Sequence, residues 1–245
     1  MVPRINGSTV LVTGANGGLG SEFVKQALTL GARRVYASAR SPREWDDARI
    51  VPLRLDVTDE RSIAEAASAA SDTTILINNA AIAFRPDNIF DVPMTEIRRA
   101  FETNFFGALA VARAFAPVVI ANGGGAFLNV HSVLSWIVGD PKGPTDGHQA
   151  YAATKAAFWS ATNSMRLNLL DEGVHVLGLH LAYTATAMTA GIEAEMNDPA
   201  DIVRIAFSGL ARGDYEVTAD GMSTTVKQAL SQPLTKMYPR LPASA

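Results

Sequence analysis

Short apolar runs alternate with amphipathic segments along the chain, and this alternation carries most of the structural information. Each run consists almost entirely of Val, Ile, Leu, Ala and other small or apolar residues. The runs lie at 8–14, 34–39, 51–57, 73–79, 126–132 and 174–182, with a shorter one at 215–220 that suits an edge strand. Runs that are apolar at nearly every position indicate strands covered on both faces, as in a parallel sheet. The pattern therefore predicts an α/β protein with a doubly wound parallel sheet and three αβα layers.

Turn-forming and capping residues mark where the helices between these runs begin and end. Gly31 is expected to end the first helix, because glycine adopts the left-handed conformation of a helix C-terminus without strain. Thr58 and Thr95 are expected to open the helices after the third and fourth runs, since a hydroxyl can accept from the free N–H groups of a first turn. A Pro- and Gly-rich loop is expected at 139–149, before a long helix that begins near His148.

The composition fits one compact domain over residues 1–245, with 48% apolar and 18% charged residues. A net charge of -3 gives no electrostatic reason to expect nucleic acid or a membrane as a partner. The absence of cysteine excludes disulfides, thiolate metal ligands and a thiol nucleophile. The four histidines lack metal-ligand spacing, so no metal is expected.

No signal-peptide pattern precedes the first apolar run, so a cytoplasmic location is expected. The most apolar later stretch, 107–121, is interrupted by Arg113 and Pro117 and is shorter than a membrane span, which indicates a buried helix.

A glycine-rich segment, Thr13-Gly-Ala-Asn-Gly-Gly-Leu-Gly20, follows the first predicted strand directly. Glycines there allow a tight turn and let the backbone approach a pyrophosphate, whose charge the free N–H groups of the next helix would meet. An ordinary strand-to-helix connection is the alternative for such a pattern taken alone. The candidate contacts are Gly14, Asn16, Gly18, Leu19 and Gly20.

The spacing TGxxxGxG resembles that of the short-chain dehydrogenases/reductases, and the resemblance implies a Rossmann fold that binds a nicotinamide dinucleotide. Asp56-Val57 resembles the adenine contact of that family, and Asn78-Asn79-Ala80-Ala81 resembles its NNAG motif with alanine in place of the last glycine. The further cofactor contacts that the resemblance implies are Asp56, Val57, Asn79, Ala80, Ala81, Tyr151, Lys155, Thr184 and Thr186.

Arg40 follows the second predicted strand, at the place where an NAD-selective enzyme carries an acidic residue for the ribose 2′-hydroxyl. A guanidinium can instead donate to a 2′-phosphate and stack on adenine. NADP(H) is therefore preferred over NAD(H). The alternative is a solvated surface arginine. In the functional interpretation, the nearby Arg33, Arg34 and Arg43 could assist Arg40 in binding the phosphate.

Reduction of a carbonyl builds negative charge on its oxygen, so the site must supply a proton. Tyr151 and Lys155 are four residues apart in YAATK, which puts both side chains on one helix face. A nearby ammonium favours the phenolate and lowers the pKa of a tyrosine. This pair alone is common by chance, and an exposed aromatic-basic pair is the alternative.

Ser132 ends the fifth predicted strand, at the carboxyl edge where open α/β sheets bind ligands. Asn104 lies within a predicted helix despite its poor helix propensity, as expected if its side chain holds a water linked to Lys155. The resemblance completes a catalytic tetrad: Tyr151 is the acid/base, Lys155 lowers its pKa and holds the nicotinamide ribose, Ser132 orients the carbonyl, and Asn104 maintains a proton relay.

Two segments depart from the family pattern and are expected to shape the substrate site. The loop 133–150 is longer than usual, although a surface insertion without catalytic consequence is the alternative. Leu181-Ala182 replaces the usual Pro-Gly before the segment 183–198, which makes the nicotinamide-facing turn less certain.

Taken together, these motifs predict an NADP(H)-dependent carbonyl reductase or alcohol dehydrogenase that transfers hydride to or from a ketone, aldehyde or secondary alcohol. Two alternatives stay open: a steroid, sugar or acyl-thioester substrate, and a non-catalytic NADP-sensing protein on the same fold. Helices 95–121 and 150–172 resemble those through which the family pairs, so a homodimer or homotetramer is expected.

Overall fold

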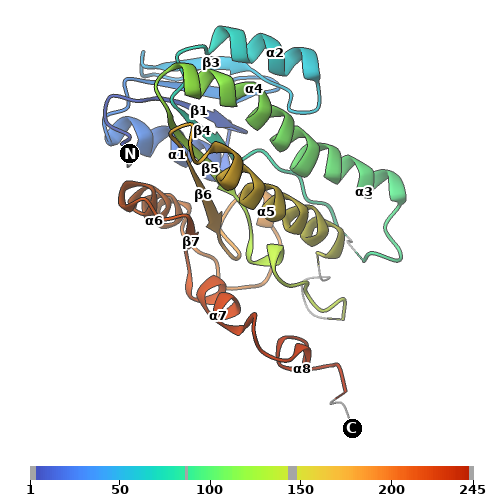
Figure 1. The fold of residues 1–245 in the computed structure, drawn as a ribbon. Helices are drawn as coiled ribbons and strands as arrows, with labels where there is room; N and C mark the ends of the chain where they lie inside the picture. The colour runs from blue at the N-terminus through green and yellow to red at the C-terminus, as the bar shows by residue number, and fades with distance from the viewer. Residues whose placement is uncertain (1–3, 86–87, 143–147, 243–245) are drawn as a thin grey trace.

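A computed structural model describes residues 4–85, 88–142 and 148–242. Its centre is a seven-stranded, wholly parallel sheet with the order β3-β2-β1-β4-β5-β6-β7 (Figure 1). The strands are β1 (Thr9–Thr13), β2 (Arg34–Ala39), β3 (Ile50–Arg54), β4 (Ile75–Asn78), β5 (Gly125–Val130), β6 (Val174–His180) and β7 (Glu216–Thr218). The chain starts in the middle of the sheet and winds outward in both directions, which confirms the predicted doubly wound fold.

An apolar layer covers each face of the sheet, so its central strands are buried on both faces. On one face, α1 (Gly18–Thr29) and α6 (Pro199–Arg212) meet through Phe23 and Phe207, whose rings lie edge to face at 5.5 Å. On the other face lie α2 (Glu60–Ala69), α4 (Ala108–Ala121) and α5 (Gln149–Leu169) (Figure 1). Fully buried Phe115 and Phe158 fill the space between α4, α5 and the sheet.

The helix before β5 is continuous over Met94–Ala121 but contains a π-helical segment. It consists of α3 (Met94–Phe101), the π-helical η1 (Glu102–Gly107) and α4. By length and composition alone it could cross a membrane. Val111, Phe115 and Val119 are nevertheless fully buried against the sheet, so one face of this helix belongs to the core.

The C-terminal segment runs along the loop between β5 and α5. After β7 come α7 (Gly221–Ala229) and α8 (Leu234–Met237), which extend away from the sheet (Figure 1). The backbone N–H of Val138 lies 3.3 Å from the Tyr238 hydroxyl, and Arg240 pairs with Asp140. The end of the chain therefore contacts the predicted substrate loop.

Three of the expected helix boundaries can be compared with the structure. Gly31 follows the end of α1 with a φ of 87°, which confirms that boundary. The prediction for Thr58 is wrong: Asp59 caps α2 by accepting from the Arg61 N–H. The prediction for Thr95 is also wrong, because α3 begins at Met94, directly after Pro93.

Candidate active site

The turn between β1 and α1 is so tight that two of its positions require glycine. Gly14 has a φ of 68°, in the left-handed region that favours glycine. A Cβ on Gly20 would lie 2.1 Å from the Gly14 carbonyl oxygen and 2.8 Å from Asn79 Nδ2. The first turn of α1 thus packs directly on the turn, and it has no side-chain cap. Close backbone approach and uncapped N–H groups suit a pyrophosphate.

The end of β4 holds this turn in place. Thr13 Oγ1 accepts from the N–H groups of Asn79, at 2.9 Å, and Ala80, at 3.0 Å. Asn79 Nδ2 donates back to the Thr13 carbonyl at 2.9 Å. Ala81 has no left-handed φ; among the described non-glycine residues only His148 has one. The alanine that replaces the last glycine of NNAG therefore fits without backbone strain.

Arg40 and Asp56 lie together at the carboxyl edge of the sheet. Arg40 is exposed directly after β2. Two hydrogen bonds from Thr58 lower the pKa of Asp56, and the nearby charges of Arg40 and Arg54 lower it further. Both Thr58 bonds end on Oδ1, at 3.0 Å from the backbone N–H and 2.7 Å from the hydroxyl. Oδ2 is left for another donor, such as an adenine amino group.

The three arginines expected to assist Arg40 have partners of their own. Arg33 and Arg34 bond to Asp72 at the amino end of the sheet, at 3.2 and 3.0 Å, so they cannot assist Arg40. The Arg43 guanidinium stacks on the Trp45 ring at 3.9 Å. Of these four arginines, Arg40 is therefore the one best placed for a 2′-phosphate.

Asn16 and Leu19 both stabilise the region of the glycine turn, Asn16 at the surface and Leu19 against the core. Asn16 Nδ2 donates to the Ser41 carbonyl at 2.8 Å, and Asn16 Oδ1 accepts from the Arg43 N–H at 3.4 Å. The Asn16 side chain therefore fixes the segment that follows Arg40. Leu19 is partly buried against the core.

Tyr151 and Lys155 lie one turn apart on α5, with the Lys155 Nζ 5.6 Å from the Tyr151 ring centre. Lys155 is 3% exposed and its Nζ donates to the Val130 carbonyl, the last of β5, at 2.8 Å. Burial lowers the pKa of Lys155 from 10.5 to about 8. Burial also raises the pKa of Tyr151 above its ordinary value. Lys155 is buried and Tyr151 is partly buried, so the exposed-pair alternative does not describe them.

Asn104 lies in the π-helical segment, and its side chain ties the segment after β4 to α5. Its Oδ1 accepts from the Ile82 N–H at 2.8 Å, and its Nδ2 donates to the Ile82 carbonyl at 2.9 Å and to Thr154 Oγ1 at 3.1 Å. Both amide protons thus have protein partners. Thr154 in turn donates to the Tyr151 carbonyl at 2.7 Å, so Asn104 is linked to the catalytic candidates through α5.

Ser132 stands two residues beyond β5 and opens a short 3-10 turn, Val133–Ser135. Its Oγ accepts from the Leu134 N–H at 3.1 Å, which leaves the hydroxyl proton for another acceptor. The turn packs against α5. The structure thus gathers Ser132, Tyr151 and Lys155 around the end of β5, with Asn104 on the neighbouring helix.

Comparison with known proteins decides the family. A family model described as short chain dehydrogenase matches residues 8–197, well over half of the chain. The chain belongs to the short-chain dehydrogenase family. This confirms the resemblance drawn from TGxxxGxG and YxxxK.

Relatives and solved structures agree with this assignment. The chain is 26% identical to an NADP-dependent 3-hydroxy acid dehydrogenase of Schizosaccharomyces pombe, over 89% of this chain and 92% of that one. It is 31% identical to a sorbitol dehydrogenase of Cereibacter sphaeroides, over 82% and 80% of the two chains. A short chain dehydrogenase from Burkholderia cenocepacia, solved with NADP, superposes with a TM-score of 0.88 at 31% identity and covers 97% of this chain and 99% of its own.

The turn after β6 departs from the short-chain dehydrogenase pattern at Leu181-Ala182 but still reaches the glycine turn. A Cβ on Gly18 would lie 3.2 Å from Thr186 Cγ2, so Thr186 packs against the pyrophosphate cradle. Thr184 is instead buried and donates to the Ala182 carbonyl at 3.2 Å. Of the two threonines, Thr186 is the one placed to contact a cofactor.

An open pocket of about 510 Å³ lies along this segment, lined by Ala185, Thr186, Ala187, Thr189, Ala190 and Met196. None of the tetrad residues lines it. The other predicted substrate segment, 133–150, is described up to residue 142 and again from His148; residues 143–147 lie outside the described part.

The predicted cofactor contact Val57 lies against η1, where a Cβ on Gly107 would come within 2.6 Å of the Val57 carbonyl oxygen. Two supporting residues of this short-chain dehydrogenase site, Asp220 and Thr154, have no motif of their own. Asp220 accepts from the Ala182 N–H at 2.7 Å and caps α7 through the Ser223 N–H. Thr154 is completely buried. Its position directly before Lys155 is the one signal in the sequence that could have indicated a role.

Proposed function

We propose that the protein is an NADP(H)-dependent oxidoreductase that transfers hydride between the nicotinamide and a ketone, an aldehyde or a secondary alcohol. The observation that carries this proposal is the buried Lys155, fixed by the Val130 carbonyl one turn from Tyr151. A lysine is buried without an ion-pair partner only where other interactions offset its desolvation, and perturbed pKa values of this kind cluster at functional sites.

The residues of the site fit the cofactor. Gly14, Gly18 and Gly20 would hold the pyrophosphate, because their tight turn lets the backbone approach a phosphate closely. Arg40 would hold the 2′-phosphate and Asp56 the adenine, because both stand at the same carboxyl edge of the sheet. When bound, the nicotinamide supplies or accepts the hydride. The NADP in the names of two matched proteins supports the preference for NADP(H).

The protein's own groups would handle the proton. In reduction, the Tyr151 phenol donates its proton to the carbonyl oxygen as negative charge develops there, and the Ser132 hydroxyl donates a second hydrogen bond to the same oxygen. The Lys155 ammonium favours the resulting phenolate. Asn104 keeps α5 at the correct distance from the segment after β4 through Thr154.

Replacement of the phenol tests this assignment. Purified protein should consume NADPH with at least one member of a panel of ketones, aldehydes, steroids, sugars and acyl thioesters. Tyr151→Phe should lower kcat about 100- to 10,000-fold, the range of a lost general acid, with NADPH affinity unchanged. Tyr215→Phe, at an exposed tyrosine beside β7, is the matched control. Full activity of Tyr151→Phe would refute the role, and NADPH binding without turnover would favour the NADP-sensing alternative.

We further propose that the protein forms a homodimer or homotetramer through the outer faces of α4 and α5. Large apolar side chains are exposed along these helices and at their ends: Phe106 in η1, directly before α4, is 50% exposed, Leu167 in α5 is 78% exposed, and Leu170, directly after α5, is 59% exposed. Covering such residues between two copies would bury apolar area. Gel filtration with light scattering measures the assembly directly, and a monomer would contradict the proposal.

A further inference from the structure

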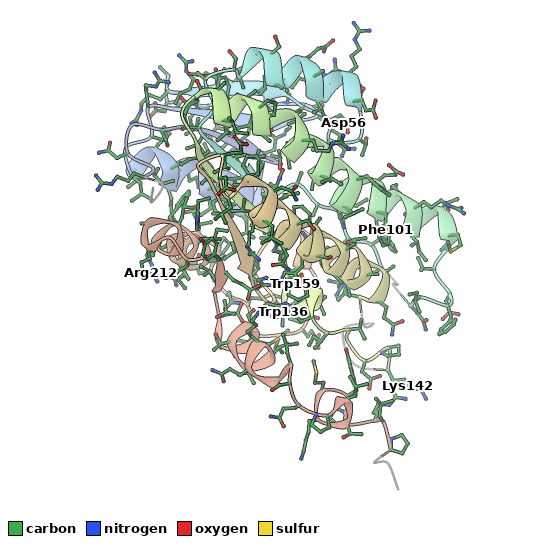
Figure 2. All side chains as sticks on the ribbon, viewed as in Figure 1. Asp56, Phe101, Trp136, Lys142, Trp159 and Arg212 are labelled. Carbon is green, nitrogen blue, oxygen red and sulfur yellow. The ribbon has the colours of Figure 1, made fainter. Side chains whose placement is uncertain are left out.

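A cluster of side chains lies behind Ser132, and the proposed reaction does not use it. Its members come from five elements: His180 from β6, Glu216 from β7, Trp136 from the turn after β5, Trp159 from α5 and Lys227 from α7. Figure 2 shows Trp136 and Trp159 close together, and their rings are perpendicular with centres 6.4 Å apart. The sheet, α5 and α7 therefore meet at one point beside the proposed catalytic serine.

His180 is the centre of this cluster and is completely buried. Its Nδ1 lies 3.2 Å from the Ser132 carbonyl oxygen, with hydrogen-bond geometry. Its Nε2 lies 3.3 Å from Glu216 Oε1. The ring stacks on Trp136 with centres 3.8 Å apart and planes 14° apart. Contacts on two edges and one face fix both the position and the plane of the imidazole.

Glu216 is held as a carboxylate by its other partners. Burial alone would raise its pKa, but contacts from His180, Lys227 and Trp159 outweigh burial and lower the pKa to about 2. Trp159 Nε1 donates to Oε1 at 3.0 Å, and Lys227 Nζ pairs with Oε2. The same ammonium lies 4.8 Å from the Trp136 ring centre. The cluster therefore extends from half-exposed Lys227 to the buried serine turn.

The tautomer of His180 decides whether its contact with the Ser132 carbonyl is a hydrogen bond. A carbonyl oxygen can only accept, so the contact is a hydrogen bond only if His180 carries a proton on Nδ1. The neighbouring nitrogen has a charged partner at 3.3 Å but lacks hydrogen-bond geometry toward it. The bond to the serine carbonyl is thus the directional contact of this ring.

The orientation of the Ser132 peptide determines where its hydroxyl points. Its N–H donates to Ser135 Oγ at 3.3 Å, and its carbonyl accepts from the Ser135 N–H at 2.9 Å as well as from His180. The N–H and the carbonyl belong to the two planar peptide units that meet at the Ser132 Cα. Hydrogen bonds to both groups therefore fix φ and ψ of Ser132 and, with them, the direction of its Cα–Cβ bond. A hydrogen bond to this carbonyl therefore acts on the direction of Oγ.

We infer that His180 is a positioning residue for Ser132: its Nδ1–H holds the serine carbonyl, while Glu216 and Trp136 hold its ring. The inference rests on the proposed function, because it concerns the serine that would bind the substrate oxygen. It assigns to the cluster a role in aiming the hydroxyl. A misplacement of about 1 Å in such a group lowers rates about 100-fold.

Three replacements of His180, two with an amide side chain and one with a phenyl ring, distinguish a positioning role from a packing role. His180→Asn places an amide N–H near the position of Nδ1, whereas His180→Gln places it near Nε2, and His180→Phe keeps only the stacking ring. We expect kcat to fall about 10- to 100-fold in His180→Gln and His180→Phe, with KM for NADPH within about twofold of wild type. We expect His180→Asn to retain at least about tenfold more kcat than His180→Gln.

The matched control is His175, at the other end of β6, where Nε2 lies 2.9 Å from the Asp214 carbonyl oxygen. His175→Asn and His175→Gln should have the same kcat as each other, because this histidine does not contact the Ser132 turn. Wild-type kcat in His180→Phe would overturn the inference, and so would a kcat of His180→Asn as low as that of His180→Gln.

Nitrogen NMR of the wild-type imidazoles tests the bond even where a variant fails to fold. We expect a proton on Nδ1 of His180 at neutral pH, and a proton on Nε2 alone would overturn the inference. If no substrate of the panel is turned over, the proposed function fails, whereas the nitrogen spectrum still decides whether His180 donates to Ser132.

Discussion

Lys155 is a buried cation, and its replacement by methionine should separate stability from activity. The side chain is 3% exposed, and its Nζ donates to the Val130 carbonyl at 2.8 Å. Within the described part of the chain, no carboxylate forms an ion pair with it. Methionine has a similar length and fills irregular apolar space readily. Lys155→Met therefore removes a charge with little change in volume.

The stability change follows from the pKa shift. Burial lowers the pKa of Lys155 from 10.5 to about 8, which corresponds to about 3 kcal/mol against the charged lysine in the folded protein. Loss of the hydrogen bond from the charged ammonium to Val130 costs about 1.5–3 kcal/mol. We expect Lys155→Met to be more stable than wild type at pH 7 by up to about 1.5 kcal/mol, while kcat falls about 100- to 10,000-fold.

The pH dependence of stability independently tests whether Lys155→Met stabilises the protein. Because the folded pKa is the lower one, the unfolded chain binds more protons between about pH 8 and 10.5, so wild-type stability gains in that window. The advantage of Lys155→Met is complete below the folded pKa and should shrink by about 1 kcal/mol between pH 7 and pH 9.

Urea unfolding of both proteins at the two pH values measures this difference. Lys25→Met, at a lysine whose side chain is 63% exposed, is the control and should show no such dependence. A Lys155→Met protein less stable than wild type at pH 7 would refute the reasoning.

Two further predictions concern the cofactor cradle. Arg40→Ala should weaken NADPH binding about 10- to 100-fold and NADH binding less than about twofold, because a charge-assisted bond to phosphate contributes about 1.5–3 kcal/mol. Titration calorimetry measures both affinities. Arg34→Ala, at the opposite edge of the sheet, is the control and should change neither affinity. Gly20→Ala should lower the free energy of unfolding by about 1–3 kcal/mol and abolish NADPH binding, since its Cβ would lie 2.1 Å from the Gly14 carbonyl oxygen; wild-type stability and affinity would contradict the tight packing of the turn.

The sheet could be predicted from the sequence because its strands are buried on both faces. Short apolar segments such as 75–77 and 126–128 have few other structural explanations once they alternate with amphipathic segments. Helix starts were harder, because adjacent residues compete for the cap. Thr58 and Asp59 can both cap a helix, and Asp59 does so since Asp56 engages both the N–H and the hydroxyl of Thr58.

Only part of the candidate site could be predicted from the sequence, because many of its contacts join residues that are far apart in the chain. Motifs record residues that are close in sequence, as Tyr151 and Lys155 are, or that follow a strand, as Gly14 does. The partners of a buried polar group come from distant segments: Asn104 bonds to Thr154, fifty positions away. His180 meets Ser132 across forty-eight positions, and no local pattern marks that contact.

The location of the site follows from how its polar groups are satisfied. Buried polar side chains require hydrogen-bond partners, and the carboxyl ends of the strands supply backbone groups where the chain leaves the sheet. Lys155 uses the carbonyl of Val130, the final residue of β5, and His180, the final residue of β6, reaches the carbonyl of Ser132. Asn79 likewise bonds to the carbonyl that ends β1. The same edge that can receive a cofactor thus also anchors the side chains proposed to act on the substrate.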